Sequence, residues 1–316
     1  MPLHPDCALY LKGAADWAAA QGLPAFWEMP GARARQLYRE SILASKPPLA
    51  SMDLVEDLTI PARGGPRPIR ILRPKVADGA RLPVMLYLHS GGYVIGGIDE
   101  SEQEARRFAA ETPALVISAS YRLAPEHHFP AAAEDAYDAL LWVAQNAASY
   151  GGDANRLIVG GCSAGGGLTA IVARLTTERK GPRIALAVLL CPWLDLTMSQ
   201  ASVARYARGF DLDREFLDWF VAAYIGPGSK AADPLASPLL HPVPKPHPPT
   251  LVLAAECDPL FDEAKLYADK LRTAGIPVTV IEAPGMIHAF NEITHLIPAG
   301  VPLLQPLAAE VRRALG

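Results

Sequence analysis

Hydrophobic residues along this chain gather in short continuous runs, and apolar positions at helical spacing fill most of the intervals between the runs. Continuous apolar runs are typical of strands that a sheet buries on both faces. We expect such strands at 83–89, 114–121, 156–161, 184–193, 249–256 and 277–284. The helical spacing predicts helices at 100–111, 131–150, 164–180 and 261–275, with a last helix at 303–316.

Two shorter strand candidates come before these runs, at 53–62 and 68–74, joined by a turn that contains Gly64, Gly65 and Pro66. Strands that alternate with helices predict an α/β fold, in which a mostly parallel sheet is covered by helices on both faces.

Two parts of the chain break this alternation. Residues 1–50 have helical spacing without a strand, and the long interval 195–235 contains a further helical pattern. Because long insertions between core elements often form lids, we interpret both as parts of a helical cap over the site. The expected division is 1–50 for the N-terminal part of the cap, 51–194 for the core, 195–235 for the cap insertion and 236–316 for the remaining core.

The composition is that of a globular protein, with 50% hydrophobic and 20% charged residues among 316. The net charge is −4 and the pI is near 6.1, without a basic block, which argues against nucleic acid or an anionic membrane as a partner. No signal peptide is expected at the start of the chain. The charge-free run 157–173 is Gly-rich and short, so we expect no stable membrane insertion.

The four cysteines, Cys7, Cys162, Cys191 and Cys257, match neither a zinc pattern nor a C-x-x-C pair. The last three lie in or beside apolar runs. We therefore expect buried free thiols and a cytoplasmic location, where thiols stay reduced.

The strongest chemical signal is the motif G-x-S-x-G at residues 161–165, with Ser163 at its centre. A predicted strand precedes it and a predicted helix follows, as a nucleophile elbow requires. Glycines allow the sharp turn, which lifts the serine hydroxyl to the N-terminus of a helix. The sequence therefore predicts Ser163 as a catalytic nucleophile.

A serine hydroxyl needs a base and an orienting acid, which in this fold follow the serine in the order acid, then histidine. His288 comes just after a predicted strand, whereas His295 lies in a less defined segment. We predict His288 as the base. For the acid we favour Asp258 at a strand exit over Glu256, and over Asp262, which has a plain role at a helix start.

The oxyanion hole is expected from the loop after the strand at 83–89 and from the amide that follows the nucleophile. Small residues in this loop let bare N–H groups face the developing negative charge. We assign Gly91, Gly92 and Ala164 to the hole. The chain has no phosphate-binding glycine motif, so a nucleotide site is a poor interpretation.

Together these segments resemble the hormone-sensitive-lipase-like family of carboxylesterases, also called bacterial family IV, of the α/β-hydrolase superfamily. The matching segments are HSGGY at 89–93, YRLAPEHHFPAAAEDAYDALLWV at 121–143, GCSAGG at 161–166, DPLFDEAKLYADKL at 258–271 and GMIHAF at 285–290. They extend over most of the core, and the long YRLAPE segment is far more specific than the elbow.

The resemblance implies an eight-stranded α/β-hydrolase core with a helical cap, short- to medium-chain acyl esters as substrates, and neither cofactor nor metal. It also implies that Arg122 and Glu126 brace the loop around the site. The chain departs from the family pattern in three places: Ser90 replaces the first glycine of H-G-G-G, Cys162 replaces Asp or Thr before the nucleophile, and His288-Ala289-Phe290 replaces His-Gly-Phe. We expect activity to survive the change at Ser90, and the change at Ala289 is small. Cys162 can alter the packing of the turn, and we interpret it as an inert thiol in a packed elbow rather than a reactive one.

The expected reaction is a two-step acyl transfer through an acyl-enzyme intermediate. A lactonase, amidase or peptidase would share the same triad, and a non-catalytic ligand receptor would share the same fold. Tyr93, beside the oxyanion loop, is the residue we expect to contact substrate. The expected partner is a small-molecule ester; the sequence leaves the oligomeric state, including a homodimer, open.

Overall fold

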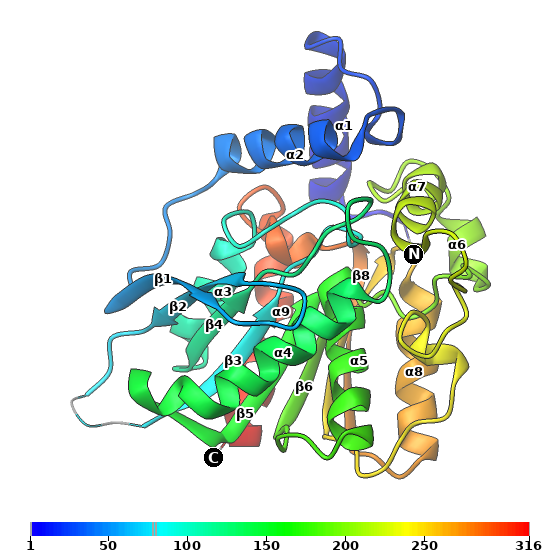
Figure 1. Cartoon of the computed structure of the whole chain (residues 1–316). Helices are drawn as coiled ribbons and strands as arrows, with labels where there is room; N and C mark the ends of the chain where they lie inside the picture. The colour runs from blue at the N-terminus through cyan, green and yellow to red at the C-terminus, as the bar shows by residue number, and fades with distance from the viewer. Residues whose placement is uncertain (1, 78, 80, 316) are drawn as a thin grey trace.

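One eight-stranded sheet forms the centre of the computed structural model, which describes residues 2–77, 79 and 81–315 (Figure 1). The strand order is β1-β2-β4-β3-β5-β6-β7-β8. The strands are β1 (Leu54–Ile60), β2 (Arg67–Arg73), β3 (Leu82–Leu88), β4 (Leu115–Ala119), β5 (Gly152–Cys162), β6 (Leu186–Leu190), β7 (Thr250–Cys257) and β8 (Val278–Ile287).

The sheet is mostly parallel, as predicted. Strand β2 pairs antiparallel with both β1 and β4, and every other pairing is parallel. Strands β3, β4 and β6 are buried along their whole length, because helices cover both faces of the sheet. Exposed and half-buried residues alternate along β1, which forms one edge of the sheet.

The helices lie on both faces of the sheet (Figure 1). Successive strand residues point to opposite faces, so Val84 and Leu86 join one core cluster while Met85 and Tyr87 join another. The first cluster packs under α4 and α5, and the second packs under α3 and α9. The bounds of the core helices are α3 (Glu102–Glu111), α4 (Ala131–Asn146), α5 (Ala164–Glu178), α8 (Phe261–Thr273) and α9 (Val301–Leu315).

The two segments that broke the alternation are helical and lie outside this core. The N-terminal segment forms α1 (Pro5–Ala20) and α2 (Gly31–Ser45), and the insertion forms α6 (Ala201–Arg205) and α7 (Arg214–Ile225). Figure 1 shows α1 and α2 above the sheet and α6 and α7 beside its upper edge. The two segments touch where the ring of Phe26 stacks on that of Phe216, 5.5 Å between centroids.

Several element boundaries differ from those expected. Strand β5 begins at Gly152 rather than near 156, and β8 continues to Ile287 rather than ending near 284. The longer β8 carries the chain directly to His288 at the end of the sheet. Both extensions pass through Gly or Pro positions, where an apolar run is interrupted and its ends cannot be recognised from the pattern.

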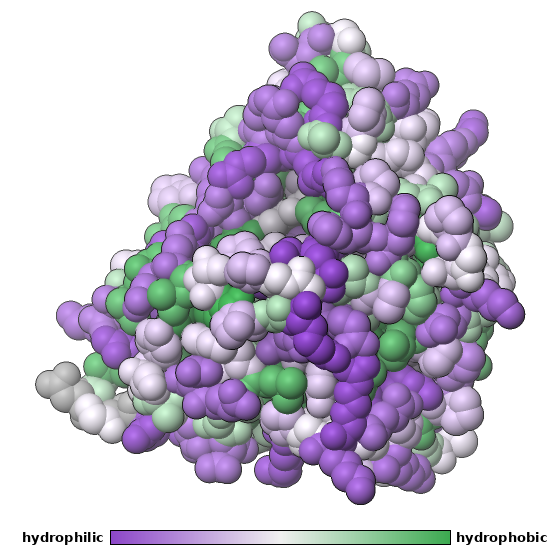
Figure 2. Space-filling view, viewed as in Figure 1, coloured by the Kyte–Doolittle hydropathy of each residue, from purple (hydrophilic) through white to green (hydrophobic). Residues whose placement is uncertain are grey.

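Within the described ranges, no helix combines the length and the apolar character needed to cross a bilayer. On the face that Figure 2 shows, hydrophilic residues dominate and hydrophobic ones are scattered in small groups.

Candidate active site

Ser163 occupies a sharp turn between β5 and α5. Its backbone has φ 56° and ψ −117°, a conformation that L-residues rarely adopt. The turn packs tightly on β3: a Cβ added at Gly161 or at Gly165 would collide with the carbonyl oxygen of Leu88. Glycine is therefore required on both sides of the serine, which accounts for the G-x-S-x-G pattern.

A chain of hydrogen bonds joins Ser163 to His288 and His288 to Asp258. The distance from Ser163 Oγ to His288 Nε2 is 2.9 Å, and that from His288 Nδ1 to Asp258 Oδ2 is 2.7 Å. A carboxylate only accepts, so Nδ1–H donates to Asp258, and the neutral ring then accepts the serine proton at Nε2. The other carboxylate oxygen of Asp258 accepts from the backbone N–H of Leu260 at 2.8 Å.

All three side chains are nearly closed off from solvent. Ser163 and His288 are 6% and 7% exposed, and Asp258 is 1% exposed. Burial favours the neutral imidazole, but the charge of Asp258, its hydrogen bond, and the carboxylates of Asp211 and Glu292 outweigh it, so the pKa of His288 is raised. The arrangement provides a hydroxyl, a base in contact with it and an acid that fixes the base.

The competing acids make other contacts. Glu256 accepts a hydrogen bond from the backbone N–H of Gly285 at 2.9 Å. Asp262 accepts from the backbone N–H of Ser202 at 2.8 Å, near the start of α8. The other histidine that sequence reasoning considered, His295, lines the cavity described below rather than bonding to Ser163. The structure therefore brings together the three residues that the sequence favoured.

The predicted oxyanion residues lie at the end of β3 and the start of α5. Gly91, Gly92 and Tyr93 have positive φ values of 111°, 58° and 64°. A Cβ at Gly91 would collide with the carbonyl oxygen of Ile95. Within the described residues, neither the Gly91 nor the Gly92 N–H donates to a protein acceptor, and Ala164 N–H belongs to the unpaired first turn of α5. Their role in an oxyanion hole stays a prediction.

Tyr93 lies in the core rather than on a cavity wall. Its side chain is 0% exposed, and its ring stacks on Tyr224 at 4.0 Å and on Trp193 at 6.0 Å between centroids. Phe220 of α7 packs against Gly92, because a Cβ added at Gly92 would collide with its ring.

A cavity of about 90 Å³ lies beside His288. Its walls come from α1 and α2, from the segment before α3, from the insertion and from the chain after β8. The lining residues are Tyr10, Tyr38, Ile42, Ser45, Lys46, Glu100, Gln103, Asp211, His288, Ala289, Glu292, Ile293 and His295. Both predicted cap segments therefore contribute to one cavity, although the domain boundaries themselves stay a prediction.

Two acidic residues of this cavity, Asp211 and Glu292, were not found from the sequence. Glu292 lies on a short 3-10 helix just after His288, and Asp211 lies in the insertion. Neither stands in a motif. The sequence held one indication of a residue such as Glu292. Ser90 is polar and stands in a loop of glycines, and a buried hydroxyl there needs a hydrogen-bond partner.

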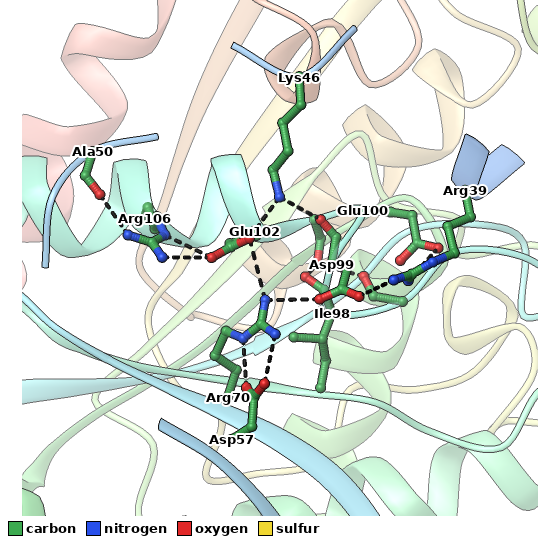
Figure 3. Close-up of polar contacts among 12 residues, drawn as sticks. Arg39, Lys46, Ala50, Asp57, Arg70, Ile98, Asp99, Glu100, Glu102 and Arg106 are labelled. Atoms are coloured by element: carbon green, nitrogen blue, oxygen red, sulfur yellow. Dashed lines mark hydrogen bonds and ion pairs between the residues drawn. The ribbon is translucent and has the colours of Figure 1, made fainter. Parts of the chain in front are cut away.

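An ionic network holds the side of the cavity formed by α2 (Figure 3). Lys46, the residue that follows α2, contacts Glu102 Oε2 at 2.6 Å and the carbonyl oxygen of Asp99 at 3.0 Å. Arg70 contacts both carboxylates, at 2.9 Å for Asp99 and 3.3 Å for Glu102, and Arg106 pairs with Glu102 at 2.7 Å. The network joins α2 to α3 and to β2, so the predicted cap is attached to the core by charges.

Two residues of the YRLAPE segment brace the same region, as the resemblance implies. Arg122 pairs with the buried Asp135 at 2.8 Å, and Glu126 pairs with Arg35 of α2. Arg35 also donates to the carbonyl oxygens of Val94 and Ala124, at 3.0 and 2.9 Å. The segment therefore connects α2 with the loop after the oxyanion residues.

The four cysteines are free and buried, as expected. Cys191, Asp258 and His288 bring three potential metal ligands within 4.8 Å of one another. Burial raises the pKa of the Cys191 thiol, which opposes the thiolate that a metal would need. The mutual hydrogen bond of His288 and Asp258 occupies the other two groups, so this set fits proton transfer better than metal binding.

Comparison with known proteins adds an independent observation. A family model described as the alpha/beta hydrolase fold matches residues 85–292. The chain is 36% identical to an ethyl acetate hydrolase of Pseudomonas putida, over 94% of both chains. It is 34% identical to the carboxylesterase NlhH of Mycobacterium tuberculosis, over 99% of this chain and 97% of that protein.

Solved structures agree. A hyperthermophilic esterase from Pyrobaculum calidifontis superposes with a TM-score of 0.90 at 36% identity, covering 99% of each chain. An ester hydrolase from the metagenome of Lake Arreo superposes with a TM-score of 0.93 at 34% identity, covering 98% of each chain. These likenesses extend over the predicted cap as well as the core.

Proposed function

The chain belongs to the hormone-sensitive-lipase-like family of α/β-hydrolases and is a carboxylic-ester hydrolase, and from this premise we propose that it acts through Ser163, His288 and Asp258 on short- to medium-chain acyl esters. The observation that carries the proposal is the continuous pair of hydrogen bonds from Ser163 through His288 to Asp258 at a strained strand-to-helix turn.

The first step is acylation. Ser163 Oγ attacks the ester carbonyl carbon and its proton passes to His288 Nε2, while Asp258 stabilises the imidazolium. The N–H groups of Gly91, Gly92 and Ala164 donate to the oxyanion. The C–O bond to the alcohol then breaks, and the alcohol leaves with the proton that His288 returns.

The second step is deacylation. His288 takes a proton from a water molecule, whose oxygen attacks the acyl carbon and forms a second oxyanion in the same place. Collapse of this intermediate releases the carboxylic acid and returns the proton to Ser163 Oγ. Atoms balance without a cofactor: one ester and one water give one acid and one alcohol.

The named activity of a relative supports a short substrate. The Pseudomonas putida relative is named for hydrolysis of ethyl acetate, an ester with a two-carbon acyl group. The cavity beside His288 does not measure the acyl length, because Ser163, Gly91, Gly92 and Ala164 are not among its lining residues.

A series of p-nitrophenyl esters from acetate to dodecanoate tests this function. We expect the highest kcat/KM at the short end of the series and a fall with longer chains, in line with the ethyl ester of acetic acid named for the Pseudomonas putida relative. A phosphonate ester should abolish the activity and label Ser163, as peptide mass spectrometry would show. Absence of activity on every ester, with turnover of a lactone or an amide instead, would favour those alternatives.

The activity should also depend on pH through His288. Only the neutral imidazole accepts the serine proton, so kcat/KM falls about tenfold per unit below the pKa of His288. Because that pKa is raised, the acid limb should be centred above the ordinary value of 6.5. The measurement is kcat/KM from pH 5 to 8 with a neutral ester, followed by titration of the acid released. A flat profile over this range would contradict the assignment of His288.

A further inference from the structure

The oxyanion loop 89–93 adopts a conformation that its own residues do not favour. Three successive residues, Gly91, Gly92 and Tyr93, have positive φ, and the last of them carries a large side chain. A bulky residue keeps this conformation only when its surroundings hold it there. The contacts that hold the loop therefore decide where its amides point.

Contacts to the backbone fix both ends of the loop. The hydroxyl of Tyr121 donates to the carbonyl oxygen of His89 at 2.8 Å, and the two rings stack at 4.1 Å. At the other end, Ala124 N–H donates to the carbonyl oxygen of Tyr93 at 2.9 Å. Between these ends, the side chain of Ser90 provides one further contact.

Ser90 is bonded to Glu292. Its Oγ–H donates to Glu292 Oε2 at 2.7 Å, between residues 202 positions apart in the chain. The other oxygen of Glu292 lies 3.4 Å from the hydroxyl of Tyr87 on β3. Ser90 is 7% exposed and Glu292 is half-buried, so the bond is partly shielded from solvent.

Glu292 has no place in the acyl-transfer steps, yet it lies four residues after His288 and lines the same cavity. Burial raises its pKa to about 7, against the opposing effects of Ser90 and His288. Burying a carboxyl group costs free energy unless hydrogen bonds or opposite charges compensate for its lost hydration. Its neighbour Asn291 donates to Glu104 at 3.1 Å, which anchors the short helix to α3.

We propose that Glu292 is a positioning residue for ester hydrolysis, which through Ser90 ties the oxyanion loop to the segment that carries His288. The bond between Ser90 and Glu292 keeps the Gly91 and Gly92 amides in a fixed position relative to His288. Ser90 is essential to this bond because a glycine at position 90 has no hydroxyl. The inference rests on the proposed function, since it assigns a role only if these amides receive an oxyanion.

A double-mutant cycle tests the proposal. We expect Ser90→Gly and Glu292→Ala each to lower kcat about tenfold or more with KM changed less than twofold, because a misplaced oxyanion donor weakens the transition state alone. The double variant should be no worse than either single variant, since both changes break one bond. Glu292→Gln should recover part of kcat, because its amide oxygen still accepts from Ser90.

The pH profile gives a second readout. The groups that interact with Glu292 are Ser90, Tyr87, Glu104, His288, Tyr38, Cys162, Tyr121 and Cys191. Glu292→Gln removes the negative charge that Glu292 carries as the pH approaches and passes its pKa of about 7, so the acid limb of kcat/KM should move to lower pH. Ser90→Gly removes no charge from the surroundings of His288. We therefore expect the acid limb of kcat/KM to stay in place while kcat falls.

The matched control is Ser118→Gly on β4, a buried serine whose hydroxyl has no partner in the described part of the chain. It should leave kcat unchanged, and thermal melting should show that every variant is folded. Additive losses in the cycle, a change confined to KM, or full kcat in Ser90→Gly would overturn the proposal. These results leave Ser163 as nucleophile; retention of activity in Ser163→Ala would instead overturn the proposed function itself.

Discussion

Replacement of Ser163 by alanine should lower kcat by about 10⁴-fold or more while the protein stays folded, since loss of a triad member leaves only the contribution of binding and the oxyanion hole. Oγ is the atom that we propose attacks the ester, and no other hydroxyl of the described residues replaces it in the hydrogen bond to His288 Nε2. Steady-state hydrolysis of a short p-nitrophenyl ester measures the effect, with KM expected to change little.

Ser118→Ala is the matched control for this experiment. Ser118 is also a buried serine of the sheet, but it lies within β4, away from the elbow. The kcat of the Ser118→Ala variant should equal that of the wild type. A Ser163→Ala variant that keeps a tenth or more of the activity would show that another group attacks the ester.

The second large effect is expected from Asp258→Asn, which should lower kcat by about 10³- to 10⁴-fold. The neutral amide does not stabilise the imidazolium. Its oxygen is the atom that accepts from the Leu260 N–H, so its NH2 faces Nδ1 of His288 and favours the tautomer that carries the proton on Nε2. The acid limb should also move to lower pH, because Asp258 raises the pKa of His288 by its charge and its hydrogen bond.

Asp262→Asn serves as the control, and it separates the two aspartates that the sequence left in competition. Asp262 holds the backbone N–H of Ser202 rather than the imidazole, and an amide oxygen can still accept that bond. We expect kcat within about twofold of the wild type, as for a surface substitution that keeps its hydrogen bond. A larger loss in Asp262→Asn than in Asp258→Asn would reverse the assignment of the acid.

The fold could be predicted from the sequence wherever a local pattern of apolar residues identifies a strand or a helix. The run 83–89 is buried on both faces, and such a run indicates a central strand without reference to any other part of the chain. The order of the strands was not predictable in the same way, because β4 lies between β2 and β3 through contacts that no local periodicity encodes. Family resemblance supplied the eight strands and the cap.

The candidate site could be predicted where its residues belong to recognisable sequence motifs. Ser163, Asp258 and His288 each follow a strand, and the structure joins them by hydrogen bonds. Tyr93 was expected at the substrate because it neighbours the predicted oxyanion glycines. Its ring is buried against Tyr224, 131 residues away, a contact that no local pattern encodes, and its contact with substrate stays a prediction.

The strained turn at Ser163 also bears on how stable this protein can be. A non-glycine residue at φ 56° and ψ −117° costs on the order of 1–3 kcal/mol, which is a sizeable part of the net stability of a folded domain. Glycine would relieve the strain but would lack the hydroxyl. At the proposed nucleophile, selection for activity and selection for thermal robustness therefore oppose each other, and a more thermostable variant has to gain its stability elsewhere in the chain.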